Sequence, residues 1–321
     1  MEDIILELKD LKQYFSVKNS IVKNKIGDVK AVDGVSLKIK KGEAFGLVGE
    51  SGSGKTTIGR AIMRLNEKTS GEILYNGKNI YSYNRKELLE FRRKVQYIFQ
   101  DPYSSLNPRM RVGDAIAEPL ISHGLATKEN VREKVIEILN SCGLEEYYID
   151  RFPHQFSGGQ RQRLVIARAI ALSPEFIVAD EPVSSLDVSI QAQIINLFSD
   201  LKKSNELSYL FISHDLSVVE HLCDRIAIIY LGNIVEIASS DDIFNNPCHP
   251  YTKALISAIP SINPLEKKEK IILTGDIPSP SNPPKGCKFH TRCPYSMGIC
   301  KTMEPIFKEK SNAHFIGCHL Y

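Results

Sequence analysis

The residues with the clearest chemical meaning lie between Gly49 and Thr57, where the chain reads GESGSGKTT. The segment Gly49–Thr56 fits the pattern GxxxxGK[ST], in which glycines let backbone N–H groups turn inward around phosphate oxygens. In this pattern Lys55 reaches the β- and γ-phosphates, and Thr56 offers its hydroxyl to Mg²⁺. The sequence therefore predicts a nucleoside triphosphate site made of Gly49, Glu50, Ser51, Gly52, Ser53, Gly54, Lys55, Thr56 and Thr57.

A strand and a helix would position this loop. Upstream, EAFGLVG is a short apolar run typical of a buried strand, and downstream Ile58, Ile62 and Leu65 repeat at helical spacing. The helix N-terminus would add its dipole to the anion site. This context favours a phosphate loop over a chance glycine-rich turn.

Two adjacent carboxylates follow another apolar run, FIVAD, which ends at Asp180. The C-terminal end of a buried strand is where open α/β sheets place their ligands. There Asp180 can hold Mg²⁺ through water, and Glu181 can polarise an attacking water. A solvated acidic pair is the alternative, but the phosphate loop earlier in the chain favours the catalytic interpretation.

A second glycine-rich segment, FSGGQRQR at 156–163, places Ser157, Gly158 and Gly159 just before a predicted helix. A helix N-terminus of this kind is ready to bind an anion. Because the chain has one phosphate loop, the segment predicts a phosphate held by another subunit, although a simple N-capped helix would satisfy the same residues. Gln100 and His214 end two further apolar strands. A glutamine or histidine in this position does not by itself indicate a function.

The order of elements indicates the fold class. After the N-terminal β-rich region, strands alternate with helices, which predicts an α/β protein with a mainly parallel sheet covered by helices. A helical block at about 101–155 interrupts this core, and Thr127 is the expected N-cap of one of its helices. Hairpin turns are expected at Asn76-Gly77 and at Gly232-Asn233. The pattern dissolves near Pro260, so we place a domain boundary between 1–260 and 261–321.

Composition limits the class of protein. The chain is 42% hydrophobic and 25% charged, and a net charge of +3 is too weak to predict a nucleic-acid partner. Its apolar stretches are far shorter than the roughly 18 residues that a membrane span needs. The acidic N-terminus MEDIILELKD is unlike a signal or transit peptide. We expect a cytosolic protein that reaches a membrane only through a partner.

Taken together, residues 1 to about 260 closely resemble the nucleotide-binding subunits of ABC transporters. The resemblance implies an ABC-type P-loop ATPase core with an antiparallel β region, an inserted helical subdomain and head-to-tail pairing around two ATP molecules. It implies that Glu181 activates water and that His214 orients the γ-phosphate. The remaining roles that it implies are Mg²⁺ ligation by Thr56, Gln100 and Asp180, a signature segment of Ser157, Gly158, Gly159 and Gln160, and a D-loop residue Asp187. Phe156 stands where the family most often has Leu, and Phe15 is preferred to Tyr14 as the residue that stacks on adenine.

A narrower resemblance comes from QDPYSSLNPRMRVG, RFPHQFSGGQRQR, SIQAQIINLFSDL and HPYTKAL. These segments look like the ATPases of oligopeptide and dipeptide importers, of the F-type. The resemblance implies ATP-driven peptide import at the cytoplasmic face of the membrane. Its partners would be a homologous D-type ATPase, two membrane permease subunits and an extracytoplasmic peptide-binding protein. Two alternatives stay open: an importer of nickel or another small solute, and a soluble ABC-type ATPase acting on DNA repair or ribosomes.

Four cysteines crowd the end of the chain, in a segment too rich in turn-formers and prolines to bury much surface: Cys287, Cys293, Cys300 and Cys318. A disulfide framework is not expected in the cytosol. Spacing leaves zinc, with His290, His314 or His319 as substitutes, an iron–sulfur centre and no metal all open. The family resemblance implies a [4Fe–4S] cluster that clamps the C-terminal extension.

Overall fold

The structure, a computed structural model, describes residues 3–18, 25–260, 269–311 and 313–321. The chain divides into two compact units. Unit 1 comprises residues 1–5, 40–44 and 80–212, and unit 2 comprises residues 6–39, 45–79 and 213–321.

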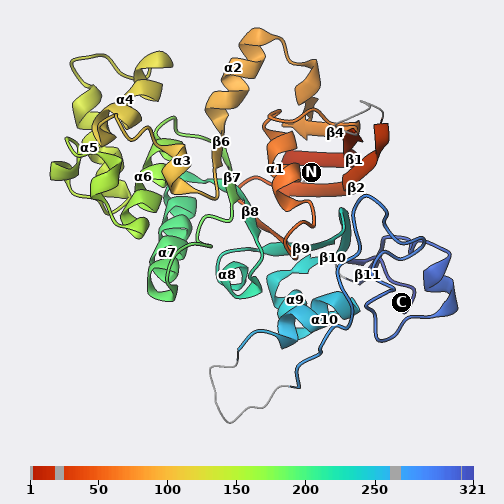
Figure 1. The fold of residues 1–321 in the computed structure, drawn as a ribbon. Coiled ribbons are helices and arrows are strands. Elements are labelled where there is room, and N and C mark those ends of the chain that lie inside the picture. Colours follow the sequence, from red (N-terminus) through yellow and green to blue (C-terminus); the bar gives the residue numbers. More distant parts are fainter. Residues whose placement is uncertain (1–2, 19–24, 261–268, 312) are drawn as a thin grey trace. The chain divides into compact units, whose positions relative to one another are not determined.

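Unit 2 contains an antiparallel sheet in the order β2-β1-β4-β5, drawn in red and orange in Figure 1. Its strands are β1 (Ile4–Lys18), β2 (Lys25–Lys40), β4 (Ser70–Tyr75) and β5 (Lys78–Asn79). The β4–β5 hairpin turns at Asn76-Gly77 as expected, and both residues have a positive φ, 48° and 77°. Such a two-residue turn needs left-handed backbone, which Asn and Gly adopt most readily.

Unit 2 also contains neighbouring strands in the order β11-β12-β10-β9-β3. They are β3 (Ala44–Val48), β9 (Arg225–Tyr230), β10 (Asn233–Ser239), β11 (Lys308–Ser311) and β12 (His314–Ile316). Strand β3 pairs with β9 in parallel, whereas β9–β10 and β10–β12 are antiparallel. The β9–β10 turn is at Leu231-Gly232, with φ of 43° and 77°. It lies one residue earlier in the chain than the expected turn at Gly232-Asn233.

The helices of unit 2 are short. They are α1 (Lys55–Ile62), α8 (Leu216–Glu220), α9 (Ser240–Asn245), α10 (Pro250–Ser257) and the 3-10 turn η4 (Gly298–Lys301). Helix α1 buries Ile58 and Ile62, as the helical spacing predicts, whereas Leu65 lies beyond its end and is exposed.

Unit 1 is built on a parallel sheet of β6 (Val95–Ile98), β7 (Phe176–Asp180) and β8 (Ser208–Ser213). Every residue of β7 and β8 is buried, which explains their uninterrupted apolar sequences. Unit 1 also contains η1 (Ile80–Ser82), α2 (Arg85–Lys94), α6 (Gly158–Ile170) and α7 (Val188–Asn205). The α/β class and the mainly parallel sheet predicted from the sequence are confirmed.

The predicted helical block follows β6. It holds α3 (Pro102–Ser105), α4 (Val112–Ser122), α5 (Val131–Ser141), η2 (Glu146–Tyr148) and η3 (Pro153–Gln155), drawn in yellow to green in Figure 1. The prediction of Thr127 as an N-cap is wrong, because α5 begins at Val131 after Asn130. Asn130 turns its side chain back to accept the N–H of Thr127, 2.8 Å away, so the two residues form a turn before the helix.

The described residues at the end of the chain are irregular except for the 3-10 turn η4 and one small hairpin. Residues 269–297 contain no helix or strand, as their prolines predict, whereas the charged linker at 261–268 falls outside the described residues. Strands β11 and β12 then pair with each other, and β12 extends the sheet beside β10. In the part of the chain that the structure describes, no helix combines the length and the apolar character needed to cross a membrane.

Candidate active site

The phosphate loop joins buried strand β3 to helix α1, the context expected from the sequence. Gly52 and Gly54 both have a positive φ, 78° and 104°. A Cβ on Gly54 would also lie 2.2 Å from the carbonyl oxygen of Ala31. Glycine is therefore required at this position both by backbone conformation and by space.

Lys55 is the first residue of α1, and its side chain turns back across the loop. Its Nζ donates to the carbonyl oxygens of Gly49 and Glu50, at 2.7 and 3.0 Å. The hydroxyl of Ser53 is buried and has no hydrogen-bond partner among the described residues. A buried hydroxyl without a partner is costly, so a ligand oxygen in the loop would satisfy it.

Asp180 and Glu181 lie where β7 ends. Asp180 is 2% exposed, and the hydroxyl of Tyr97 on β6 donates to its carboxylate at 2.7 Å. Glu181 follows with a φ of 46°, an uncommon left-handed conformation for glutamate, and its N–H donates to the carbonyl of Ile212 at 2.9 Å. Non-glycine residues held in this conformation cluster at functional sites, where the surrounding structure offsets the strain.

The structure brings Gln100 and Glu181 together. Strand β6 ends at Ile98, two residues before the expected Gln100, and the amide Nε2 of Gln100 donates to Oε2 of Glu181 at 2.9 Å. Both residues follow the carboxyl ends of adjacent parallel strands, which explains why residues far apart in sequence meet. Tyr97 completes this edge, and sequence reasoning missed it because nothing in VQYIFQ marks its hydroxyl as functional.

The 156–160 segment opens helix α6 in unit 1. Ser157 is its N-cap, and Gln160 completes a capping box, with Ser157 Oγ accepting the Gln160 N–H at 3.3 Å. Ser157 and Gly158 are exposed, and a Cβ on Gly159 would lie 2.5 Å from Ile190 of α7. Phe156 is buried, with its ring centre 5.1 Å from that of Tyr148. The segment thus combines an anion-ready helix end with a close helix contact that requires glycine.

The other predicted site residues lie on loops at element ends. Asp187 caps α7 by accepting the Ile190 N–H at 3.0 Å, and this backbone hydrogen bond lowers the pKa of its carboxyl. His214 is the exposed residue directly after β8. The phosphate loop and His214 belong to unit 2, whereas Gln100, Glu181 and Asp187 belong to unit 1.

The two candidate adenine platforms differ in their contacts. The hydroxyl of Tyr14 donates to Oδ1 of Asp33, and burial, followed by this carboxylate, raises the pKa of Tyr14. Phe15 is 43% exposed. Phe15 is therefore the more exposed of the two aromatic residues.

The four tail cysteines lie near one another, and none of the seven cysteines forms a disulfide. Burial, followed by the neighbouring Cys300, Cys318 and Cys293, raises the pKa of Cys287 to about 11. Four thiolates on one zinc ion at ~2.3 Å would lie about 4 Å apart. Among the described residues the four cysteines form no group with sulfurs within 4.8 Å of one another.

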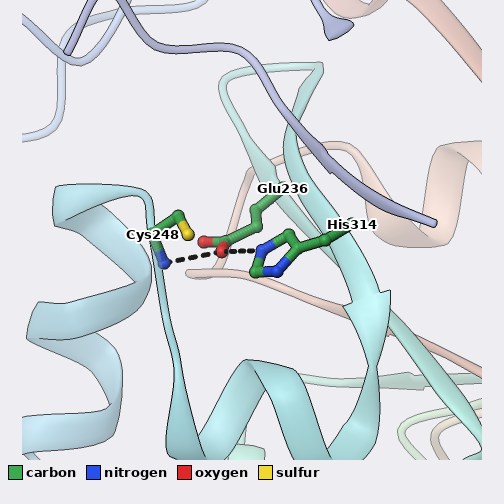
Figure 2. A group of neighbouring side chains, drawn as sticks. All are labelled: Glu236, Cys248 and His314. Atoms are coloured by element: carbon green, nitrogen blue, oxygen red, sulfur yellow. Dashed lines mark hydrogen bonds and ion pairs between the residues drawn. The ribbon is translucent and has the colours of Figure 1, made fainter. Parts of the chain in front are cut away.

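A different polar group does lie this close: Glu236 of β10, Cys248 before α10 and His314 of β12, shown in Figure 2. Glu236 is completely buried, and its carboxylate receives the N–H groups of Cys248 and His249 at 2.7 and 2.9 Å. His314 Nε2 lies 2.7 Å from the same carboxylate.

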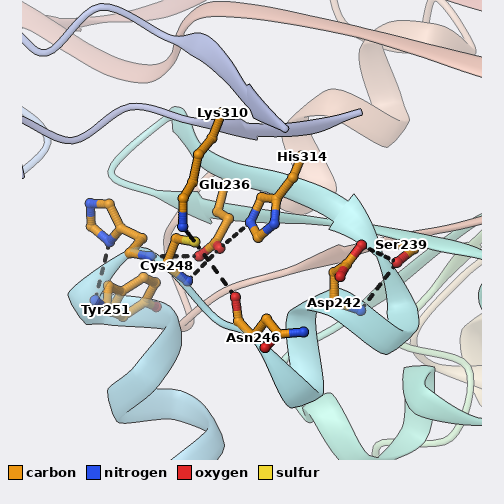
Figure 3. A network of polar contacts seen from close by, with 9 residues as sticks. Glu236, Ser239, Asp242, Asn246, Cys248, Tyr251, Lys310 and His314 are labelled. Carbon is orange, nitrogen blue, oxygen red and sulfur yellow. Dashed lines mark hydrogen bonds and ion pairs between the residues drawn. The ribbon is translucent and has the colours of Figure 1, made fainter. Parts of the chain in front are cut away.

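The surroundings of this group indicate a structural link. Figure 3 shows Lys310 of β11 above it, with Nζ 3.2 Å from the sulfur of Cys248. An ammonium group beside the sulfur disfavours a second cation there, and the carboxylate is already satisfied by donors. We therefore assign the group a structural role: it joins the C-terminal hairpin to β10 and to the start of α10.

Comparison with solved structures defines the class of protein. The dimeric ATP-binding cassette MJ0796, in a post-hydrolysis state bound to ADP and Pi, aligns with 74% of this chain and 99% of its own, with a TM-score of 0.65 and 29% identity. The structure of cbiO1 from Clostridium perfringens, part of the ABC transporter complex cbiONQ, aligns with 76% of this chain and 92% of its own, with a TM-score of 0.65 and 25% identity. Residues 32–184 match the ABC transporter family. The chain has the fold of an ABC ATPase.

Sequence relatives narrow the class. Residues 235–300 match the C-terminal region of oligopeptide/dipeptide transporters. The oligopeptide transport ATP-binding protein AppF of Bacillus subtilis is 51% identical, covering 100% of this chain and 98% of its own. The dipeptide transport ATP-binding protein DppF of Haemophilus influenzae is 46% identical, covering 98% and 96%. The chain therefore belongs to the oligopeptide and dipeptide transport family of ABC transporter ATP-binding proteins, and it is an ATPase.

Proposed function

We propose that Glu181 is the general base of ATP hydrolysis and that Gln100 positions it. The observation that carries this assignment is the contact between them, 2.9 Å, at the carboxyl edge of β6 and β7. A carboxylate whose backbone is fixed and whose side chain is held by an amide can orient a water molecule in line with the γ-phosphate. His214 would orient that phosphate and Glu181.

The phosphates are held by the loop at 49–57. Lys55 exchanges its two loop carbonyls for phosphate oxygens, and the hydroxyl of Ser53 gains the partner that it lacks. Oxygen ligands from Thr56, Gln100 and Asp180 suit Mg²⁺, a hard cation that prefers oxygen donors. When bound, Mg²⁺ neutralises the charge that develops on the phosphate oxygens. The exposed ring of Phe15 stacks on adenine.

The complete catalytic site needs a second subunit. The exposed N-terminus of α6 and Asp187 would face an ATP molecule held by a homologous D-type ATPase in a head-to-tail pair. Two permease subunits would bind the pair at the cytoplasmic face of the membrane, in part through the helical block at 101–155. Pair closure on ATP would then move the permeases.

The cargo that best fits the sequence relatives is a peptide, delivered by an extracytoplasmic binding protein. Mass spectrometry of the ligands retained by the binding protein encoded with this chain tests the assignment directly. Short peptides are the expected ligands, and nickel or another small solute in their place would overturn the peptide assignment while leaving the ATPase unchanged.

Fractionation tests whether the chain works in a transporter. The chain should sediment with membranes when the D-type ATPase and the permeases are co-produced, and remain in the supernatant when the permeases are omitted. Sedimentation with ribosomes or nucleic acid, independent of the permeases, would contradict the transporter assignment.

We also propose that the four tail cysteines hold a [4Fe–4S] cluster. The four thiols lie near enough to affect one another's pKa, and in a cubane cluster each of four thiolates binds a different iron. The three histidines that could replace a cysteine have other contacts: His290 with the Cys287 carbonyl, His314 with Glu236 and His319 with the Met303 carbonyl. The cluster would supply a cross-link that stabilises this polar segment, which has little apolar surface to bury.

A further inference from the structure

The cysteine-rich tail, residues 287–318, touches the phosphate loop through Arg292. The Nη1 and Nη2 atoms of Arg292 donate to the two carboxylate oxygens of Glu50, at 2.7 and 3.1 Å. The side chain of Arg292 is 9% exposed, and its guanidinium also lies 5.9 Å from the ring centre of Tyr230. A two-pronged arginine–carboxylate pair fixes geometry as well as charge.

Glu50 is the second residue of the phosphate loop, and its backbone takes part in the same site. Its N–H donates to the hydroxyl of Tyr251 at 3.0 Å. Its carbonyl accepts the Nζ of Lys55, also at 3.0 Å. The position of Glu50 therefore affects where Lys55 lies in the loop before phosphate oxygens replace these carbonyls.

A second basic residue of the tail makes an independent contact. Lys288 Nζ donates to Oδ2 of Asp33 at 2.8 Å and to the carbonyl of Leu231 at 3.2 Å. The other oxygen of Asp33 accepts the hydroxyl of Tyr14, the residue before Phe15. The tail thus reaches both the phosphate loop and the strand that carries the proposed adenine platform.

The segment between these two residues is anchored in the core. Phe289 is 1% exposed, with its ring centre 5.2 Å from that of Tyr230 and 5.4 Å from that of Tyr251. Lys288 directly follows Cys287, and Arg292 directly precedes Cys293. The two basic contacts are therefore each one residue away from a tail cysteine.

We infer that Arg292 is a positioning residue of the ATP site: it fixes Glu50, and through Glu50 it holds the phosphate loop in its binding geometry. Because Arg292 adjoins Cys293, the order of the tail controls ATP affinity. This inference rests on the proposed binding of ATP at 49–57. It makes the cysteine-rich tail part of the nucleotide site instead of an appendage.

The test measures binding of a fluorescent trinitrophenyl ATP to the isolated chain, purified without oxygen. Arg292→Ala should raise the dissociation constant roughly tenfold, the change that ~1.4 kcal/mol produces. Arg292→Lys should recover part of the affinity, since it restores the charge without the two-pronged geometry. The matched control, Lys301→Ala, removes an exposed tail cation and should leave binding unchanged.

Two double-variant comparisons separate positioning from general loosening of the fold. In a Glu50→Gln background, Arg292→Ala should have little further effect, because the pair that it breaks is already weakened. Likewise, Cys293→Ser should weaken binding in the wild-type background and have much less effect in the Arg292→Ala background.

Each contrary result overturns the inference. Equal ATP affinity of the wild type and Arg292→Ala would overturn it. So would ATP-affinity losses that simply add in both double variants. A Cys293→Ser variant that binds ATP as tightly as the wild type would also overturn it. If Arg292→Ala is insoluble, Glu50→Gln and Arg292→Lys carry the same test. If the wild-type chain itself binds no ATP, the proposed function fails before this inference is reached.

Discussion

Gln100 and Glu181 are 81 residues apart in sequence, and the amide of one donates to the carboxylate of the other at 2.9 Å. The contact exists because β6 and β7 are parallel neighbours in register, with Ile98 opposite Ala179. Parallel strands end at the same edge, so the residues that follow them meet there. This edge supplies the carboxylates of the proposed active site.

Glu181→Gln tests the assignment of the base. The variant should bind ATP like wild type, because the residues proposed to hold the phosphates lie in the loop around Lys55. Hydrolysis in the assembled pair should fall by about 100-fold or more, the usual loss when a general base is removed. Lys55→Ala serves as the contrasting variant, since it should weaken ATP binding itself. Normal turnover by the assembled Glu181→Gln variant would show that another residue is the base.

Ser157→Arg tests the pairing. Ser157 is the exposed N-cap of α6, and an arginine there would fill the space proposed for a phosphate held by the partner subunit. The isolated variant should bind ATP normally, whereas the pair formed with the D-type ATPase should lose hydrolysis at the site facing Ser157. A large loss of affinity in the isolated variant would contradict the head-to-tail arrangement.

Cys293→Ser tests the proposed [4Fe–4S] cluster in the tail. Protein purified without oxygen should be brown and contain about four irons per chain, as expected for a [4Fe–4S] centre. The variant should lose the colour and become sensitive to protease within residues 269–321. Cys142→Ser is the control, because Cys142 is buried in unit 1 and should not affect iron content. If the wild-type protein is colourless and contains stoichiometric zinc, the tail cysteines bind zinc and the cluster assignment is wrong.

His249 predicts a pH effect on stability. Burial lowers its pKa to about 3, and its Nδ1 accepts the Tyr251 N–H at 3.1 Å as the N-cap of α10. The unfolded chain has a histidine pKa near 6.5, so between these values it binds a proton that the folded chain does not. Folding stability from this residue is therefore full above about pH 6.5 and decreases as pH falls below it.

His249→Asn isolates that contribution, because asparagine keeps a cap acceptor but does not titrate. The decrease in the urea unfolding midpoint from pH 7 to pH 5.5 should be smaller in the variant than in wild type. An identical change with pH in both proteins would show that His249 is not the buried neutral group that this account requires.

Local patterns were sufficient to predict much of the fold. The buried strands at 44–48 and 176–180, the helix after the phosphate loop and the Asn76-Gly77 turn all depend on neighbouring residues. The errors were also local in origin. Thr127 was expected to be a helix N-cap, but the side chain of Asn130 accepts its N–H and forms a turn, so the helix begins at Val131. The β9–β10 turn was expected at Gly232-Asn233, but the residues with a positive φ are Leu231 and Gly232.

The contacts that complete the site could not be predicted in this way. Tyr97 with Asp180, Tyr251 with Glu50 and Arg292 with Glu50 join residues 83, 201 and 242 positions apart. No periodicity or motif marks such pairs, because each depends on the strand order and on how the tail folds back. The buried Glu236 was missed for the same reason: it lies in the apolar run NIVEIAS, and its partners are at Cys248 and His314.

Reconstitution of the transporter in vesicles tests the central claim most directly. The chain, the D-type ATPase and the two permeases would be assembled with the binding protein and a labelled peptide, and vesicle uptake would be measured with and without Mg²⁺-ATP. The account predicts ATP-dependent peptide accumulation that Lys55→Ala and Glu181→Gln in this chain both abolish. Accumulation of nickel but not peptide, or full peptide uptake with both variants, would contradict it.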